Sequence, residues 1–523
     1  MASFLTKAQN MGPAALIMAG SVFLSRFMGL IRDKVISYLY GAGPDTDIYF
    51  TAFVIPDFIN YLLAGGYFSI TLIPLLSRFF QQDEEEGWRF FSAAFWWIVL
   101  AIGSLTIIAW FFAHELSALA APGFDPEARA RLAQFMRIIL PAQACFLPGA
   151  CFTALLFMRR QFYIPALTPL IYNSFIILGG VFFFYAFPGS GMEGFLWGVL
   201  AGAFAGSLLL PYLAARAGGL RLSLTFAHPG LKKFILLALP LMLGQSITVL
   251  DEGFLRIFGS LGEDGGVSLL NYARRIMMVP VGVVAQAAGV ASYPFLARLV
   301  ASGDTDGFNK TLNSALLNSL AVIIPLGLWM MAVSEPTMRL IFEQGRFSTA
   351  DTAISSFLLT IMLCAVGFWA IQQILGRGFY ANENTLTPVL VGSLATVLTL
   401  PLYYLLSKKF GAPGVALAGV ISMSLYTAML IWRWKVRQGS AALSGLLVRT
   451  VSLVGISLPC AVLADMTCQL IKNAMPESPL LGAFLSLCAS GPVFGVPYLL
   501  ICRWLTPALW QDTIGILRSK LKK

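Results

Sequence analysis

Charged residues are scarce in this 523-residue sequence, at 11%, and the chain has only two histidines, His114 and His228. Soluble globular proteins contain about 25% charged and about 45–50% apolar residues, whereas 58% of this chain is apolar. So few charges cannot cover the surface of a water-soluble protein of this length. The composition therefore excludes an ordinary soluble enzyme and a disordered chain, and it predicts a protein that crosses a membrane many times.

The apolar residues lie in long uncharged runs, such as residues 95–112, and they lack the alternation of apolar and polar residues that lipid-facing strands need. We therefore expect an all-α polytopic membrane protein with about 14 transmembrane helices of about 20 to 25 residues or longer. The predicted helices lie near residues 12–40, 46–80, 89–113, 127–158, 163–187, 192–215, 232–258, 267–299, 309–333, 349–376, 385–407, 413–436, 443–469 and 479–504.

Patterns typical of metal, disulfide and nucleotide sites are missing. The seven cysteines lie in or next to apolar runs without paired spacing, and no GxxxxGK[ST] motif occurs. We expect no metal site, no catalytic residues, no ATP hydrolysis and no cofactor. A coupling cation, sodium or a proton, or the membrane potential would then drive any transport.

The formal net charge is +10, and its distribution predicts the orientation. Connections on the side of the termini are richer in Lys and Arg, for example at Arg159, Arg160, Lys232 and Lys233, than those on the opposite side. The positive-inside rule therefore predicts that both termini of this multi-pass protein are cytoplasmic. Topology and attraction to anionic lipids explain the net charge, so nucleic acid is not an expected partner.

Internal similarity divides the chain. The segment Pro74–Arg78 (PLLSR) recurs at Pro294–Arg298 (PFLAR), and the LTP of residues 167–169 recurs at residues 386–388. Two parallel six-helix repeats followed by two additional helices are an arrangement found in transporters, where the substrate site lies between the repeats. The predicted domains are residues 1–220 and 221–440 for the two lobes, and residues 441–523 for the additional helices and a cytoplasmic tail.

Apart from the Lys and Arg residues assigned to loops, tails and helix flanks, six cations lie inside the predicted spans: Arg26, Arg32, Lys34, Arg256, Arg274 and Arg275. An arginine at the centre of a span costs about 2.5–3.5 kcal/mol on insertion scales, which disfavours lipid-facing positions. A cationic cavity selects an anion, and arginine binds phosphate oxygens in bidentate fashion. The predicted substrate-binding residues are Arg26, Arg32, Asp47, Arg274 and Arg275. The alternative is snorkelling, or ion pairs with Asp33, Asp47 or Asp57.

The acidic residues leave further alternatives. Asp47 either orients an arginine or caps its own helix together with Asp45 and Thr46. Asp251 and Glu252, within the predicted seventh helix, either hold a coupling proton or sodium ion, or pair with Arg256, which lies four residues after Glu252.

Several motifs together resemble the MurJ (MviN) lipid II flippase family of the multidrug/oligosaccharidyl-lipid/polysaccharide exporter superfamily. They are SRFMGLIRD at residues 25–33, GAG at 41–43 with Thr46 and Asp47, Pro56, FS at 68–69 with Pro74, APGF at 121–124, YARR at 272–275 with Pro280, GRF at 345–347, and GFY at 378–380 with TP at 387–388. The resemblance covers essentially the whole chain.

The resemblance implies a V-shaped transporter of the bacterial cell (inner) membrane, not an enzyme. It would carry the undecaprenyl-pyrophosphate-linked peptidoglycan precursor, lipid II, from the inner to the outer leaflet by alternating access, in peptidoglycan and cell-wall biosynthesis. Arg26, Arg32 and Arg275 would bind the pyrophosphate, accompanied by Asp47, and the last two helices would form a groove for the polyprenyl tail. The implied partners are the lipid-linked precursor, membrane lipids and cell-wall synthesis proteins.

Four positions depart from the pattern of many relatives. Asn60 stands in place of an arginine, Gly65 in place of a glutamate, and Arg274 and Met278 in place of acids. Arg274 is therefore hypothesised to replace the charge missing at Asn60.

An alternative function is export of another polyprenyl-linked glycan on the same fold. A membrane enzyme acting on lipid-linked sugars is disfavoured, because no cluster of acid–base or metal-binding residues lies in a predicted loop.

Overall fold

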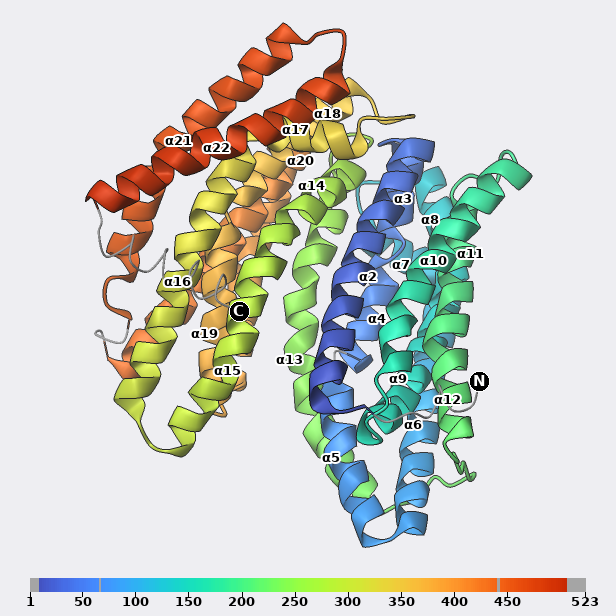
Figure 1. The fold of residues 1–523 in the computed structure, drawn as a ribbon. Coiled ribbons are helices and arrows are strands. Elements are labelled where there is room, and N and C mark those ends of the chain that lie inside the picture. Colours follow the sequence, from blue (N-terminus) through green and yellow to red (C-terminus); the bar gives the residue numbers. More distant parts are fainter. Residues whose placement is uncertain (1–8, 65–66, 440–442, 506–523) are drawn as a thin grey trace. The chain divides into compact units, whose positions relative to one another are not determined.

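The computed structural model describes residues 9–64, 67–439 and 443–505, and its regular structure within these ranges is entirely helical (Figure 1). Contacts divide the chain into two compact units, Met1–Val267 and Ser268–Lys523. A helical fold satisfies the backbone hydrogen bonds inside each spanning segment, as the interior of a bilayer requires. The predicted all-α class is confirmed.

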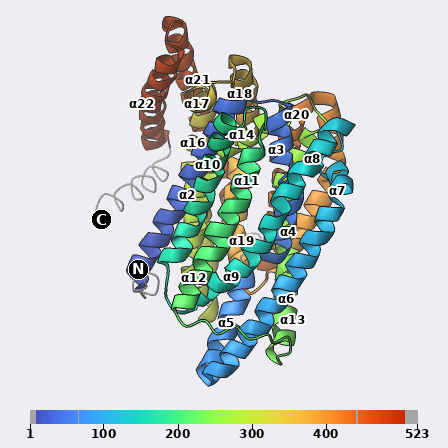
Figure 2. The ribbon, with the colours of Figure 1, turned by 90° about the vertical axis from the view of Figure 1, so that its right-hand side faces the viewer.

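The first unit packs its helices side by side. α2 lies along α10, and α10 lies along α11 (Figure 2). The helices are α2 (Met11–Tyr40), α3 (Pro44–Thr51), α4 (Val54–Ala64), α5 (Tyr67–Gln82), α6 (Glu84–Phe111), α7 (Ala113–Ala120), α8 (Pro126–Ile139), α9 (Gln143–Met158), α10 (Tyr163–Ala186), α11 (Glu193–Gly202), α12 (Leu210–Ala217) and α13 (Gly230–Gly259). A π-helical turn, Ala203–Leu209, joins α11 to α12.

The second unit ends in the helix pair α21 and α22, which pack against each other, while α21 also packs along α16 (Figure 1). Its helices are α14 (Gly266–Pro280, which begins at the unit boundary), α15 (Gln286–Ala301), α16 (Thr305–Ala332), α17 (Ser334–Phe342), α18 (Thr349–Leu363), α19 (Val366–Ala381), α20 (Leu386–Gln438), α21 (Leu446–Ala474) and α22 (Pro479–Leu505). A π-helical turn, Val281–Ala285, joins α14 to α15.

Helices cover all the predicted spanning ranges, but the number of spans stays a prediction. Within the described ranges, 10 helices are long and apolar enough to cross a membrane, and the pair α18 and α19, bent by 44°, would make 11. The predicted ranges 385–407 and 413–436 both lie in α20. Its Gly411 has φ +60° and ψ −137°, a conformation that glycine adopts most readily, so α20 consists of two helical stretches joined at this residue.

The range 46–80, predicted as one helix, is broken in the structure. α3 ends at Thr51 and α4 begins at Val54. Pro56 explains this break because proline has no N–H to bond the carbonyl of Ala52, and its ring crowds that carbonyl. Proline is tolerated in the first turn of a helix, which is where α4 places it.

The compact units are not the predicted domains. α13, which the sequence repeat assigns to the second lobe, packs against α4 and α5 and belongs to the first unit. α21 and α22 belong to the second unit and form no unit of their own. Because packing and internal repetition are different properties, the boundaries at residues 220 and 440 stay predictions about the repeat.

One close approach in the first unit requires glycine. A Cβ added at Gly149 in α9 would lie 1.7 Å from the carbonyl oxygen of Ser207, in the π-helical turn. No side chain fits at that distance, so Gly149 allows α9 to pack directly on the backbone of the turn.

The connection between α12 and α13 is tied to the helices beside it. The indole N–H groups of Trp96 and Trp97 donate to the carbonyl oxygens of Ser223, at 3.0 Å, and Phe226, at 2.9 Å. His228 accepts a hydrogen bond at Nδ1 from the N–H of Gly230, at 2.9 Å. Burial lowers the pKa of His228, although nearby Glu86 opposes this shift. A neutral imidazole also keeps Nδ1 available as an acceptor.

Candidate functional site

Two predicted binding arginines lie on α2, a candidate span. Arg32 donates from Nε and Nη2 to Oδ1 of the adjacent Asp33, at 3.0 and 2.9 Å, and the Asp33 side chain is almost fully buried. The predicted alternative of an ion pair with Asp33 is therefore confirmed for Arg32. Since this contact uses Nε and Nη2, the Nη1 group keeps its capacity to donate to an anion.

Arg26 is exposed on the same helix. The six residues that separate it from Arg32 place the two side chains about 120° apart around a straight helix axis. Lys34 follows Asp33, and its Nζ is buried without a hydrogen-bond partner among the described residues. α2 thus presents several cations that the apolar composition of a span does not require.

Asp47 is buried in the first turn of α3, where Oδ2 accepts a hydrogen bond from the N–H of Gly265 at 2.8 Å. Gly265 lies in the connection between α13 and α14 and has φ +84°, in the region that favours glycine. The cap of α3 instead uses Thr46, whose Oγ1 accepts from the N–H of Gly43 at 2.9 Å. Asp45 pairs with Arg131 of α8. Asp47 therefore holds the 260–265 connection.

A buried arginine joins α13 to α4. Arg256 donates from Nη2 to Oε1 of Glu252 at 2.6 Å and from Nη1 to Oδ2 of Asp57 at 3.1 Å. The side chain of Arg256 is 9% exposed, so both ion pairs are partly shielded from solvent. These three residues line a small cavity of about 140 Å³ together with Tyr61 and Leu119.

Glu252 thus forms the ion pair with Arg256 that the sequence offers as one alternative. The side chain of Asp251 lies outside the described residues, and so does Gly65. The contact between Arg256 and Asp57 joins residues 199 positions apart. Helical periodicity relates only near neighbours, so the sequence carried no signal for this particular pair.

The remaining predicted arginines lie on α14, in the second unit. Arg274 is half-buried, and its guanidinium lies over the ring of Trp369, 5.8 Å from the centroid, in a cation–π contact. Arg275 is exposed. Met278 on α14 and Asn60 on α4 are half-buried. The predicted residues thus lie in two groups, one in each unit.

Comparison with known proteins identifies the family. The family model "Lipid II flippase MurJ" matches residues 36–484. A relative from Rhizobium meliloti, "Probable lipid II flippase MurJ", is 28% identical over 430 residues, covering 79% of this chain and 79% of the relative. A protein of the same name from Vibrio cholerae is 26% identical over 441 residues, covering 82% and 83%.

Solved structures share the fold. One described as "Lipid II flippase MurJ, inward closed conformation" has a TM-score of 0.78 and 23% identity, over 94% of this chain and 99% of that chain. An inward-facing multidrug resistance MATE family transporter of the MOP superfamily has a TM-score of 0.66 and 14% identity, over 80% and 96%. The family match spans most of the chain, from within α2 into α22. The chain therefore belongs to the MurJ lipid II flippase family, a family of membrane transporters and not of enzymes.

Proposed function

We propose that this protein moves lipid II, the undecaprenyl-pyrophosphate-linked peptidoglycan precursor, from the inner to the outer leaflet of the bacterial inner membrane by alternating access. The observation that carries the proposal is the match of residues 36–484 to the flippase family. The likeness in fold to an inward closed flippase and to an inward-facing MATE family transporter supports a transport cycle on this scaffold.

The proposed pyrophosphate site uses Arg26 and Arg32 of α2 with Arg274 and Arg275 of α14, and Asp47 accompanies them. Guanidinium groups bind phosphate oxygens through paired N–H donors, and their cost in lipid favours positions that face protein or water. The buried Nζ of Lys34 is one more donor that an anionic headgroup would satisfy. In this proposal the cations bind the cargo by charge, without acid–base chemistry.

Three further features belong to the proposal. The distribution of Lys and Arg supports cytoplasmic termini. Coupling is assigned to a proton or a sodium ion at Asp251 and Glu252, or to the membrane potential acting on the charged cargo. The additional helices α21 and α22 are assigned to the polyprenyl tail, and cell-wall synthesis proteins are the expected partners.

Complementation tests the transport function. The chain is expressed in cells depleted of their own lipid II flippase, and growth and cell shape are followed together with the precursor exposed on the outer leaflet. We expect rescue by the unaltered chain and loss of rescue with Arg26→Ala or Arg275→Ala. Arg437→Ala, at the exposed end of α20, is the matched control and should rescue. Absence of rescue by unaltered chain that is correctly inserted would refute the proposal.

A further inference from the structure

Three charged residues that join α13 to α4 leave one negative charge uncompensated in the first unit. We call Asp57, Glu252 and Arg256 the Arg256 cluster. Arg256 donates to Glu252 at 2.6 Å and to Asp57 at 3.1 Å, so one guanidinium serves two carboxylates. A guanidinium keeps its proton in proteins. With both carboxylates ionised, one positive and two negative charges therefore leave the cluster with a net charge of −1.

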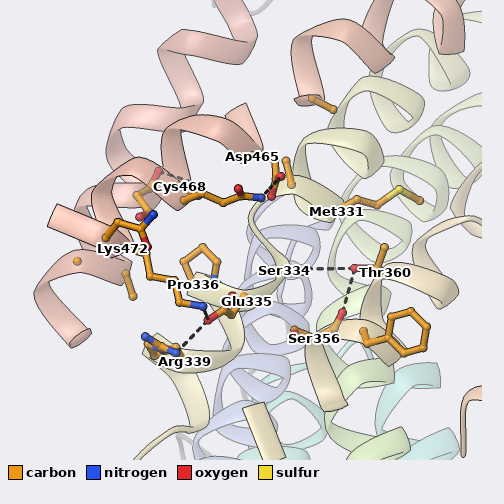
Figure 3. A pocket seen from close by; sticks show the side chains of 18 of the residues that line it. Met331, Ser334, Glu335, Pro336, Arg339, Ser356, Thr360, Asp465, Cys468 and Lys472 are labelled. Atoms are coloured by element: carbon orange, nitrogen blue, oxygen red, sulfur yellow. Dashed lines mark hydrogen bonds and ion pairs between the residues drawn. The ribbon is translucent and has the colours of Figure 1, made fainter. Parts of the chain in front are cut away.

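A larger cavity in the second unit, of about 880 Å³, shows the opposite arrangement (Figure 3). There Glu335 accepts from Nζ of Lys472 at 2.6 Å and from Nη2 of Arg339 at 2.9 Å, so two cations surround one carboxylate. Asp465 also lines this cavity, and its two cations and two carboxylates balance. The excess negative charge beside Arg256 is therefore a property of that site and not of charged cavities in this protein generally.

Among the residues that the structure describes, no further charged side chain lines the cavity beside the Arg256 cluster. The lining comes from α4, α7 and α13, and its only other titratable group is the phenol of Tyr61. The neighbouring helices α3, α5, α6, α8 and α9 contribute nothing to it. Arg32 of α2 and Tyr172 of α10 act on Asp57 electrostatically. Arg32 is itself paired with Asp33, and phenols are neutral near pH 7, so the excess charge remains.

This excess charge opposes the binding of an anion nearby. A pyrophosphate bound to Arg32 would bring negative charge toward a cluster that is already negative, and such repulsion is strong where protein excludes water. Adding one proton to either carboxylate makes the cluster neutral and removes the repulsion. Two carboxylates that share one site take up such a proton as a pair.

The geometry of the cluster favours a proton over a metal ion. The guanidinium of Arg256 already contacts both carboxylates, and it would repel a second cation placed beside them. Hard metal ions take about six or more oxygen ligands, whereas the lining side chains supply two carboxylates and one phenol. A proton needs a single carboxylate oxygen. Water can deliver it, because the side chains of Asp57 and Glu252 are 37% and 46% exposed.

We propose that the Arg256 cluster takes up one proton when an anionic cargo binds to Arg32, and releases it when the cargo leaves. The proton comes from water and forms an O–H bond on Asp57 or Glu252, and no bond of the cargo changes. Cargo and proton then strengthen each other's binding by the same factor. This inference rests on the proposed transport function and names its coupling ion.

Proton uptake during cargo binding tests the proposal. The purified full chain, in weakly buffered detergent between pH 6 and 8, is mixed with lipid II. A pH-indicator dye records protons, and native mass spectrometry records bound lipid. A pyrophosphate diester ionises well below this range, so the cargo itself takes up none. We expect a maximum of about one proton per bound lipid II. Binding without proton uptake would overturn the proposal and leave the transport function standing, whereas absence of binding would refute the function on which it rests.

Neutral variants of the two acids separate proton uptake from a structural role. Affinity of the unaltered chain for lipid II should fall about tenfold from pH 6 to pH 8, as linkage to one proton requires. Asp57→Asn keeps an acceptor for Arg256 and leaves one cation with one carboxylate, as in the protonated cluster. We expect Asp57→Asn to take up no proton and to bind lipid II at pH 8 as tightly as the unaltered chain does at pH 6. Glu252→Gln should behave in the same way. A purely structural contact predicts weaker binding by both variants at every pH.

Asp45→Asn is the matched control. Asp45 is an acid on the neighbouring helix α3 that pairs with Arg131 and does not line the cavity. This variant should keep both the proton uptake and the pH dependence of binding. Unchanged proton uptake in Asp57→Asn and Glu252→Gln, or its equal loss in Asp45→Asn, would overturn the proposal. Binding that requires sodium and does not depend on pH would overturn it as well.

Discussion

The hydrogen bond between Asp47 and Gly265 allows a structural role of a predicted site residue to be separated from a role in transport. Asp47 is 3% exposed, and its carboxylate accepts a hydrogen bond from the Gly265 N–H at 2.8 Å. A hydrogen bond to a charged group contributes about 1.5–3 kcal/mol. Asp47→Ala removes this contact and leaves a buried N–H, so we expect it to destabilise the first unit by about 2 kcal/mol.

Asp47→Asn keeps an acceptor oxygen at the same place and removes only the charge. Its loss should be smaller, about 1 kcal/mol, since a neutral hydrogen bond contributes about half as much as a charged one. For a domain of this size about 1 kcal/mol corresponds to about 2–4 °C in Tm. Thermal unfolding in detergent should therefore rank the unaltered chain above Asp47→Asn, and Asp47→Asn above Asp47→Ala.

Asp45→Ala is the matched control for Asp47→Ala. Asp45 lies on the same helix and is paired, but its side chain is 43% exposed and that of its partner Arg131 is 39% exposed. Exposed pairs contribute about 0–1 kcal/mol, so this variant should lower Tm by less than Asp47→Ala. If Asp47→Ala unfolds at the same temperature as Asp45→Ala, the reasoning from burial is wrong. If Asp47→Asn stays folded and loses transport, the charge of Asp47 serves the cargo as well.

Three further outcomes are expected. Gly149→Ala places a methyl group against the carbonyl oxygen of Ser207 and should abolish accumulation of folded protein, whereas Gly103→Ala, with nothing within 4 Å of the added carbon, should accumulate normally in membranes. The lowered pKa of His228 means that the folded state favours neutral imidazole. Stability should therefore be complete above the unfolded pKa of about 6.5 and should decrease as pH falls below it. A flat Tm profile between pH 7 and 5, or an unchanged profile in His228→Gln, would refute this. Arg274→Glu should reduce complementation at least tenfold and Arg274→Lys should preserve it; wild-type rescue by the glutamate variant would exclude the hypothesis that this charge compensates for Asn60.

Much of the fold was predictable because the membrane imposes a simple pattern. Long apolar runs identified the positions of the helices, and the ends of α2 and α16 lie within a few residues of the prediction. The internal breaks were harder to predict. The π-helical turns at residues 203–209 and 281–285 lie inside apolar runs and produce no change in hydropathy. The range 46–80 shows that one proline can outweigh a continuous apolar run, because a missing N–H is more decisive for a helix than hydrophobicity.

The candidate site was predictable in its residue types but not in its contacts. The scarcity of charge identified the arginines inside spans, since each needs a compensating partner. Local partners follow from helix geometry, and the contact of Arg256 with Glu252 is one of them. Contacts such as Asp47 with Gly265, 218 positions apart, depend on the packing of whole helices. No spacing rule could have predicted them.

Neighbouring carboxylates change how strongly two of the cations predicted inside spans attract an anion. Arg32 and Arg256 lie beside carboxylates at 2.9 and 2.6 Å, so each forms part of a neutral or acidic group. Such a guanidinium is held in a fixed direction, but the adjacent carboxylate offsets much of its attraction for a distant anion. Arg26 and Arg275 are exposed on their helices. In the proposed site, Arg32 would therefore determine how the oxygens of a bound pyrophosphate are oriented.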